Sequence, residues 1–134
     1  MKELEVVAAI IEYDNKILCL QRGQSKFPST AYKYEFPGGK VESGEKLEEA
    51  LSRELNEELE MNVVVKSSDY FMTVHHEYPE FTITMHSFIV KVDSPDFVRK
   101  EHINQVWASP NEEMRNLDWA AADKPIVERL IKDK

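Results

Sequence analysis

Carboxylates and glycines are concentrated in one segment, Phe36 to Met61, which reads FPGGKVESGEKLEEALSRELNEELEM. Two adjacent glycines open the segment, and seven glutamates follow between Glu45 and Glu60. Carboxylates gathered in one place can bind hard divalent cations or transfer protons. Glycine lets the backbone approach a ligand closely, although a tight turn before a helix would need it equally. The acids are therefore either a solvated helix face or a site.

The phase of the expected helix separates these acids into two groups. Residues 45–60 contain no glycine, proline or β-branched residue, which favours a helix. A rotation of about 100° per residue gathers the leucines and Ala50 into one apolar stripe. Glu54 and Glu58 fall within about 20° of the centre of this stripe, and Glu57 lies at its edge. The other glutamates of the helix face the opposite side and need only water.

The acids on the apolar stripe require a partner. A charge that faces a core is costly unless it is paired, and like charges one turn apart repel. Arg53 is a nearby cation, but it projects about 100° away from Glu54. Three converging carboxylates suit Mg²⁺ or Mn²⁺. The sequence thus favours a metal site over a satisfied structural network or a metal-free pair for proton transfer.

The remaining elements must hold this helix in place, and most of them are strands. Strands are expected at 4–13, 16–22, 34–36, 61–66, 70–78, 81–92 and 103–109, with turns at Asp14–Asn15 and Pro79–Glu80. Gly23–Lys33 is expected to be a loop, 110–116 a helical turn and 123–132 a closing helix. This pattern predicts an α/β fold, with a central mixed β-sheet flanked by helices.

Composition limits the class of protein. The chain has 134 residues, which suits a single domain over 1–134, and a net charge of −8. That charge argues against binding to a nucleic-acid backbone, but a divalent cation would allow a small anionic ligand. The longest apolar run is VVAAII, and no signal segment opens the chain, so no membrane association is expected. Cys19 is the only cysteine, and a reducing, cytoplasmic setting is expected.

The spacing of the glycine, arginine and glutamates in this segment resembles a known family signature. Gly39 is followed after five residues by Glu45, after seven more by Arg53-Glu54-Leu55, and then by Glu57-Glu58 and Glu60-Met61. This looks like the Nudix box, and the likeness extends over nearly the whole chain. It is strongest to the MutT-type branch and, within it, to the CTP pyrophosphohydrolases. One position departs, because Glu60 stands where the family usually has a glycine that ends the helix.

The resemblance implies a Nudix (MutT-like) α/β/α sandwich and a set of functional residues. Arg53 and Glu45 would form an ion pair that holds the loop and the helix in register. Divalent cations, Mg²⁺ or Mn²⁺, would be bound by acids and by backbone carbonyl groups. The implied metal ligands are Glu54, Glu57, Glu58, Glu101 and the backbone near Gly38 and Gly39. The implied substrate contacts are Arg22, Glu35, Phe36 and Asp123, and His86, Phe81 and Trp119 are candidate pocket walls.

The implied reaction is hydrolysis of a nucleoside triphosphate to a monophosphate and pyrophosphate. Metal ions would neutralise phosphate charge and activate water, and Glu54, Glu58 or Glu101 would take its proton. Asp123 would contact the base of (d)CTP or an oxidised dNTP such as 8-oxo-dGTP in nucleotide-pool sanitation, unless it only caps the last helix. Two alternatives stay open: a Nudix hydrolase of ADP-ribose or a dinucleoside polyphosphate, and a non-catalytic nucleotide sensor. The sequence does not decide between a monomer and a homodimer.

Overall fold

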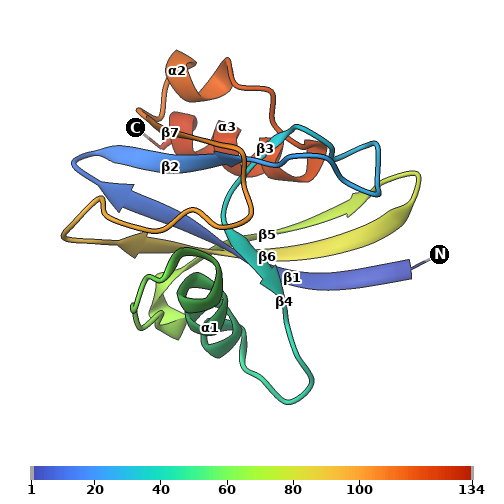
Figure 1. Ribbon diagram of the computed structural model, residues 1–134, viewed down its shortest axis with the longest axis horizontal. Helices are drawn as coiled ribbons and strands as arrows, with labels where there is room; N and C mark the ends of the chain where they lie inside the picture. The colour runs from blue at the N-terminus through green and yellow to red at the C-terminus, as the bar shows by residue number, and fades with distance from the viewer. Residues whose placement is uncertain (1, 134) are drawn as a thin grey trace.

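A seven-stranded mixed sheet lies between helices in the computed structural model, which describes residues 2–133 (Figure 1). The strands are β1 (Lys2–Tyr13), β2 (Lys16–Gln21), β3 (Tyr34–Glu35), β4 (Gly38–Lys40), β5 (Tyr70–Glu77), β6 (Phe81–Lys91) and β7 (Asn104–Ala108). The helices are α1 (Leu47–Leu59), α2 (Glu112–Arg115) and α3 (Lys124–Lys132), with 3₁₀ turns at Ser67–Asp69 and Ala121–Asp123. Helix α1 covers one face of the sheet, and α2 and α3 lie on the other. The expected sandwich is confirmed.

The sheet has the strand order β3-β2-β1-β6-β5, with β4 added to β1 and β7 added to β2. Strands β1 and β6 run parallel, and the other pairs are antiparallel. The expected hairpin between β1 and β2 turns at Asp14 and Asn15, which both have positive φ. Such a turn matches the twist of antiparallel strands. None of the described helices is long and apolar enough to cross a membrane.

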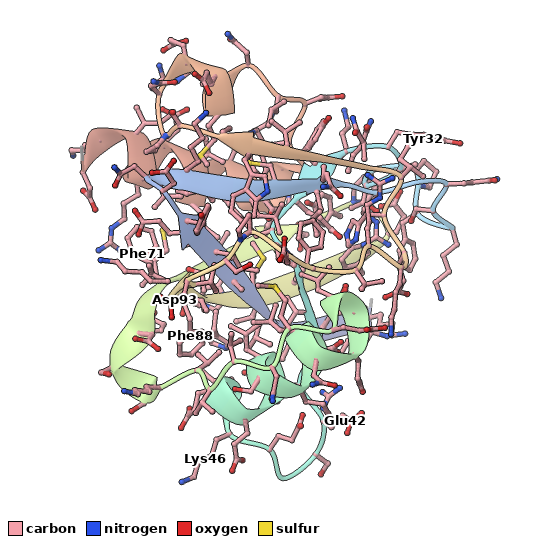
Figure 2. The ribbon with its side chains drawn as sticks, turned by 60° about the vertical axis from the view of Figure 1, so that its left-hand side comes forward. Tyr32, Glu42, Lys46, Phe71, Phe88 and Asp93 are labelled. Carbon is pink, nitrogen blue, oxygen red and sulfur yellow. The ribbon has the colours of Figure 1, made fainter. Side chains whose placement is uncertain are left out.

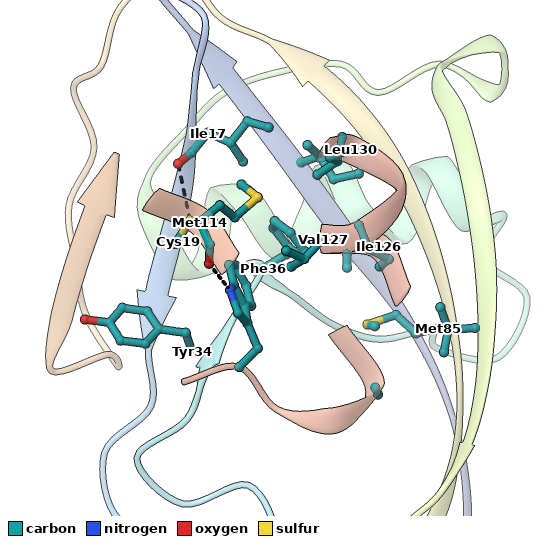
Figure 3. Close-up of a cluster of buried hydrophobic side chains, with 14 of the residues drawn as sticks. Ile17, Cys19, Tyr34, Phe36, Met85, Met114, Ile126, Val127 and Leu130 are labelled. Atoms are coloured by element: carbon teal, nitrogen blue, oxygen red, sulfur yellow. Dashed lines mark hydrogen bonds between the residues drawn. The ribbon is translucent and has the colours of Figure 1, made fainter. Parts of the chain in front are cut away.

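Strand β1 is buried on both faces because a helical layer packs on each side. Val7, Ala9 and Ile11 face the layer that contains α1. Ala8 and Ile10 face the opposite cluster, where Ile126 and Leu130 of α3 pack (Figure 3). This explains why β1 reads as a nearly continuous apolar run instead of an alternating one.

Helix α1 is anchored to the sheet by a row of leucines. Leu51, Leu55 and Leu59 are fully buried, and they share a cluster with Phe88 of β6, which is labelled in Figure 2. The stripe expected from the sequence is the one that packs. The helix begins after Lys46, whose extended backbone marks its start.

The two glycines of the box form a strand and not a turn. Gly38 and Gly39 lie in β4 opposite Ala8 and Val7 of β1, and neither has a positive φ. A Cβ on Gly38 would lie 1.9 Å from the carbonyl oxygen of Val7. Glycine is therefore needed here because the backbones of β1 and β4 approach closely. The sequence had suggested close approach of this backbone to a ligand, and not to another strand.

The strand expected at residues 61–66 is absent. Val65 is buried but Val64 is 82% exposed, so the alternation of a strand is present in the side chains. The backbone N–H of Val65 donates to Oγ of Ser52 on α1, at 2.9 Å, and not to another strand. Among the described residues this segment therefore contacts α1 and pairs with no strand.

The end of α1 gives a testable consequence for stability. Glu60 adopts a left-handed conformation with φ of 53°, so the helix ends as it would with the family's glycine. We expect Glu60→Gly to raise the free energy of unfolding by about 0.5–1 kcal/mol, because the left-handed strain it removes exceeds the value of an exposed ion pair to Lys100. Urea denaturation measures this change. Asn56→Gly, inside the same helix, should lower stability, and equal effects of the two variants would contradict the prediction.

Candidate active site

The pairing of β1 changes partner along its length, and a cavity lies beside this change. Strand β2 pairs with β1 only near the turn, at Glu12 and Tyr13, whereas β4 pairs with Val6, Val7 and Ala8. A cavity of about 400 Å³, here called the acidic cavity, lies beside β4. Its lining residues are Arg22, Gly23, Gln24, Glu35, Gly38, Gly39, Glu54, Glu58, Glu101 and His102.

Three acids from two distant segments line the acidic cavity. Glu54 and Glu58 come from α1, and Glu101 comes from the loop between β6 and β7. Burial raises the pKa of Glu58 to about 8, and the charges of Glu101, Glu54 and Glu35 contribute. Burial also raises the pKa of Glu54, which the charge of Arg53 opposes. The cavity therefore holds more negative charge than its neighbours compensate.

The carboxylates of these acids are suitable ligands for a hard divalent cation, but they lie too far apart to bind one without moving. Carboxylate oxygens are the ligands that Mg²⁺ prefers. Among residues 2–133, however, no three histidine, cysteine or acidic side chains are grouped closely enough to hold a metal ion as they stand. Besides burial, the charge of Glu101 raises the pKa of both Glu54 and Glu58, so these carboxylates repel one another, and a bound cation would offset that repulsion.

The position of Glu54 depends on Gly39. A Cβ at residue 39 would lie 2.2 Å from Oε2 of Glu54. The carboxylate therefore rests directly on the backbone of β4, in space that any larger residue would fill. This contact brings the carboxylate and the β4 backbone together at one wall of the acidic cavity.

Arg53 binds several acids at the edge of the site. Its Nε lies 2.7 Å from Oε2 of Glu45, so the expected ion pair is present, and Nη2 donates to the carbonyl oxygen of Lys40 at 3.1 Å. This bonding holds the pKa of Glu45 below its usual value. Nη1 contacts Glu57 at 3.0 Å and Glu54 at 3.4 Å. The expectation that Arg53 projects away from Glu54 was wrong, because its long side chain bends back across the helix.

Glu57 lies apart from the other box acids in this structure. Its side chain is 54% exposed, and it does not line the acidic cavity. The helix phase places it at the edge of the apolar stripe, and Arg53 holds it there. A role for Glu57 as a metal ligand stays a prediction.

A second cavity, here called the apolar cavity, adjoins the first. It has a volume of about 320 Å³, and Arg22, Glu35, Gly38 and Gly39 line both cavities. Its remaining walls are mostly apolar and include Leu4, Val6, Phe27, Phe36, Ile83 and Met85. The ring of Phe36 packs against Trp119, with centroids 4.7 Å apart. With a divalent cation bound by its acids, the acidic cavity would match the polyanionic end of a ligand whose flat, mostly apolar end enters the apolar cavity.

Asp123 is the buried carboxyl of the apolar cavity. It is only 5% exposed, and Oδ1 accepts the backbone N–H of Phe36 at 3.2 Å. Its side chain makes no cap bond to α3, so the alternative that it only caps this helix is wrong. Burial raises the pKa of Asp123 well above its usual value, and the charge of Glu35 adds to this effect. A protonated carboxyl at this place can both donate and accept a hydrogen bond.

His86 does not lie where the sequence suggested. It lines neither cavity, and its ring nitrogens bond to Thr73 and Glu5, at 2.9 and 3.0 Å. Met85, its neighbour on β6, faces the apolar cavity, so strand alternation turns His86 to the opposite face. Placing His86 in the substrate pocket was therefore a wrong prediction. Phe81 packs beneath the same region, against Phe27.

Sequence reasoning missed His102. This residue lines the acidic cavity, and Nε2 lies 2.9 Å from Oε2 of Glu35. Arg22 also binds Glu35, with Nη1 at 3.2 Å from Oε1. The position of His102 directly after Glu101 was the one signal in the sequence that could have identified it.

The raised pKa of Glu58 predicts a pH dependence of stability. In the presence of a chelator that removes divalent cations, the carboxyl of Glu58 loses its proton near pH 4.5 in the unfolded chain. In the folded protein it keeps the proton until about pH 8. The folded state thus binds more protons between these values, and its stability should fall as pH rises from 4.5 to 8. Glu58→Gln should reduce the fall of the melting temperature with pH, which differential scanning fluorimetry measures. An unchanged slope would contradict the burial of this charge, and Glu48→Gln is the control on the same helix.

Comparison with known proteins gives consistent matches over nearly the whole chain. A model of the NUDIX domain matches residues 1–130. The CTP pyrophosphohydrolase of Escherichia coli strain K12 is 41% identical, covering 98% of this chain and 93% of that protein. The 8-oxo-dGTP diphosphatase of the same strain is 30% identical, covering 97% and 98%. The crystal structure of the MutT protein from Methanosarcina mazei Go1 has a TM-score of 0.84 at 27% identity, covering 98% and 95%.

Proposed function

This chain belongs to the Nudix hydrolase family, and we propose that it hydrolyses (d)CTP or an oxidised dNTP to the monophosphate and pyrophosphate. The observation that carries the proposal is the pair of joined cavities. The acidic cavity suits a metal-bound triphosphate, and the apolar cavity suits a base. The similarity to a CTP pyrophosphohydrolase and an 8-oxo-dGTP diphosphatase supports the same substrates. Nucleotide-pool sanitation is the biological role that follows.

Nudix hydrolases generally need a divalent cation, and we propose Mg²⁺ for this protein. Glu54, Glu58 and Glu101 would hold it, with a backbone carbonyl of Gly38 or Gly39, and Glu57 would join them after turning from Arg53. A bound cation would neutralise phosphate charge and acidify a water molecule. This compensation would allow a chain of net charge −8 to hold a polyanion.

The side chains of the acidic cavity would then serve proton transfer and orientation. One of Glu54, Glu58 and Glu101 accepts the proton of the attacking water. A carboxyl whose pKa is raised toward neutrality is a more effective base than an ordinary one. Arg53 keeps the loop before α1 fixed to the helix through Glu45 and Lys40, so that the acids keep their place.

The apolar cavity would select the base. Phe36 offers an apolar wall, and Asp123 offers a carboxyl that is already bonded to the N–H of Phe36. With its proton retained, Asp123 can donate to a ring acceptor while its other oxygen accepts from an exocyclic amine. Cytosine presents both groups side by side, and 8-oxoguanine also offers donors and acceptors on one edge.

A substrate panel tests the proposal. Nucleoside triphosphates, deoxynucleoside triphosphates, their oxidised forms and ADP-ribose are incubated with Mg²⁺, and pyrophosphate, phosphate and monophosphate are quantified. Pyrophosphate from cytidine nucleotides or 8-oxo-dGTP is the expected result. Turnover of ADP-ribose alone would support the alternative Nudix substrate instead. Binding without turnover of any nucleotide would indicate a sensor and overturn the proposal.

A further inference from the structure

His102 is a buried side chain for which neither the box nor the base pocket provides a reason. Its side chain is 5% exposed, and its Nε2 lies 2.9 Å from Oε2 of Glu35. Its Nδ1 is also buried and has no hydrogen-bond partner among the described residues. The ring therefore makes one polar contact within residues 2–133, and that contact is to Glu35.

This environment determines which ring nitrogen carries the hydrogen. A hydrogen on Nδ1 alone would be a buried donor without an acceptor, and the lone pair of Nε2 would then face a carboxylate oxygen. Both arrangements are unfavourable. Nε2 therefore carries a hydrogen and donates it to Glu35. Because the acceptor is a carboxylate, this bond is stronger than one between neutral groups.

Glu35 occupies the junction of the two cavities. It lines both of them, as Arg22 does, whereas His102 lines only the acidic cavity. Its strand, β3, has two residues, so the sheet alone restrains it little. The ion pair to Arg22 is partly solvated, with the side chain of Arg22 41% exposed, and such pairs are weak. The bond from His102 is shorter, at 2.9 Å, and the His102 side chain is 5% exposed, so this bond is the stronger restraint on the Glu35 carboxylate.

We propose that His102 is a positioning residue that fixes the Glu35 carboxylate, beside the guanidinium of Arg22, at the junction of the two cavities. The proposal rests on the proposed function, because a nucleotide that spans both cavities must pass this junction. Glu101 reaches the acidic cavity from the adjacent position in the chain. Two neighbouring residues thus have separate tasks, Glu101 at the acidic cluster and His102 at the junction.

Steady-state kinetics with the best nucleotide of the panel test the proposal. His102→Ala is expected to raise KM by about tenfold or more, the value of a hydrogen bond to a charged group, with less than a threefold change in kcat. His102→Gln keeps an N–H donor of similar reach, so its KM should stay within about threefold of the wild type. His75→Ala, an exposed histidine bonded to Thr84, is the matched control.

A double-mutant cycle separates positioning from a general effect on folding. In a Glu35→Ala background, His102→Ala should cause no further rise in KM, because its target is gone. Thermal unfolding of each variant shows that kinetics are measured on folded protein. Additive effects of the two substitutions, a wild-type KM in His102→Ala, or a loss confined to kcat would each overturn the proposal.

Nitrogen-15 NMR of the histidine rings gives a readout that needs no turnover. We expect a hydrogen on Nε2 of His102 in the wild type and a mixture of tautomers in Glu35→Ala. A ring that carries its hydrogen on Nδ1 alone overturns the proposal, whatever the activity. If the wild type turned over no nucleotide, the proposed function would fail, and this spectrum would still decide whether His102 holds Glu35.

Discussion

Glu58→Gln is expected to lower kcat for nucleoside triphosphate hydrolysis by about a thousandfold or more, while the protein stays folded. Glu58 lies in the acidic cavity among Glu54, Glu101 and Glu35, where its charge is poorly compensated. The amide has almost the same volume but carries no charge, so a cation loses a ligand and the packing of α1 is kept. Glu54→Gln should behave in the same way.

The measurement combines kinetics at saturating Mg²⁺ with thermal unfolding. The stability of the wild type should rise with the logarithm of the Mg²⁺ concentration once this exceeds Kd, and that of Glu58→Gln should rise much less. Glu48→Gln, on the same helix but outside the cavity, is the matched control and should behave as the wild type. Near-wild-type turnover of Glu58→Gln at saturating Mg²⁺ would contradict the metal site.

Alanine at the two adjacent glycines of β4 should affect different properties, stability at Gly38 and turnover at Gly39. Gly38→Ala is expected to lower the free energy of unfolding by about 3–4 kcal/mol, because the new Cβ would lie 1.9 Å from the backbone oxygen of Val7 in a central strand. Gly39→Ala meets the end of a flexible side chain, Glu54, at 2.2 Å. That carboxylate can move, so stability should change little, and kcat should fall by about a hundredfold as Glu54 is displaced.

Urea denaturation and kcat, measured on both variants, check this contrast. Gly44→Ala is the control, since Gly44 has φ of +85° and no atom within 4 Å of an added Cβ. It should cost about 1–2 kcal/mol from backbone strain alone and leave kcat unchanged. A stable Gly38→Ala variant, or a fully active Gly39→Ala variant, would show that β4 does not hold the site as described.

Much of the helix and the sheet could be predicted because both have short periods. The apolar stripe of α1 identified Leu51 and Leu55 as core residues, and it set Glu54 and Glu58 on the side that faces the sheet. The failures occurred where a contact partner decides the structure. Residues 61–66 have the residue types of a strand but no strand beside them, and Val65 bonds to Ser52 of α1 instead.

The sequence by itself determined the helix phase, the acids on it and most of the individual strands, since each depends on residues a few positions apart. Only the tertiary structure decided the rest of the site. Gly38 and Gly39 form a strand because β1, some thirty positions earlier, supplies the pairing. His102 meets Glu35 across 67 positions. No local periodicity records such contacts, because chain folding alone brings the two partners together.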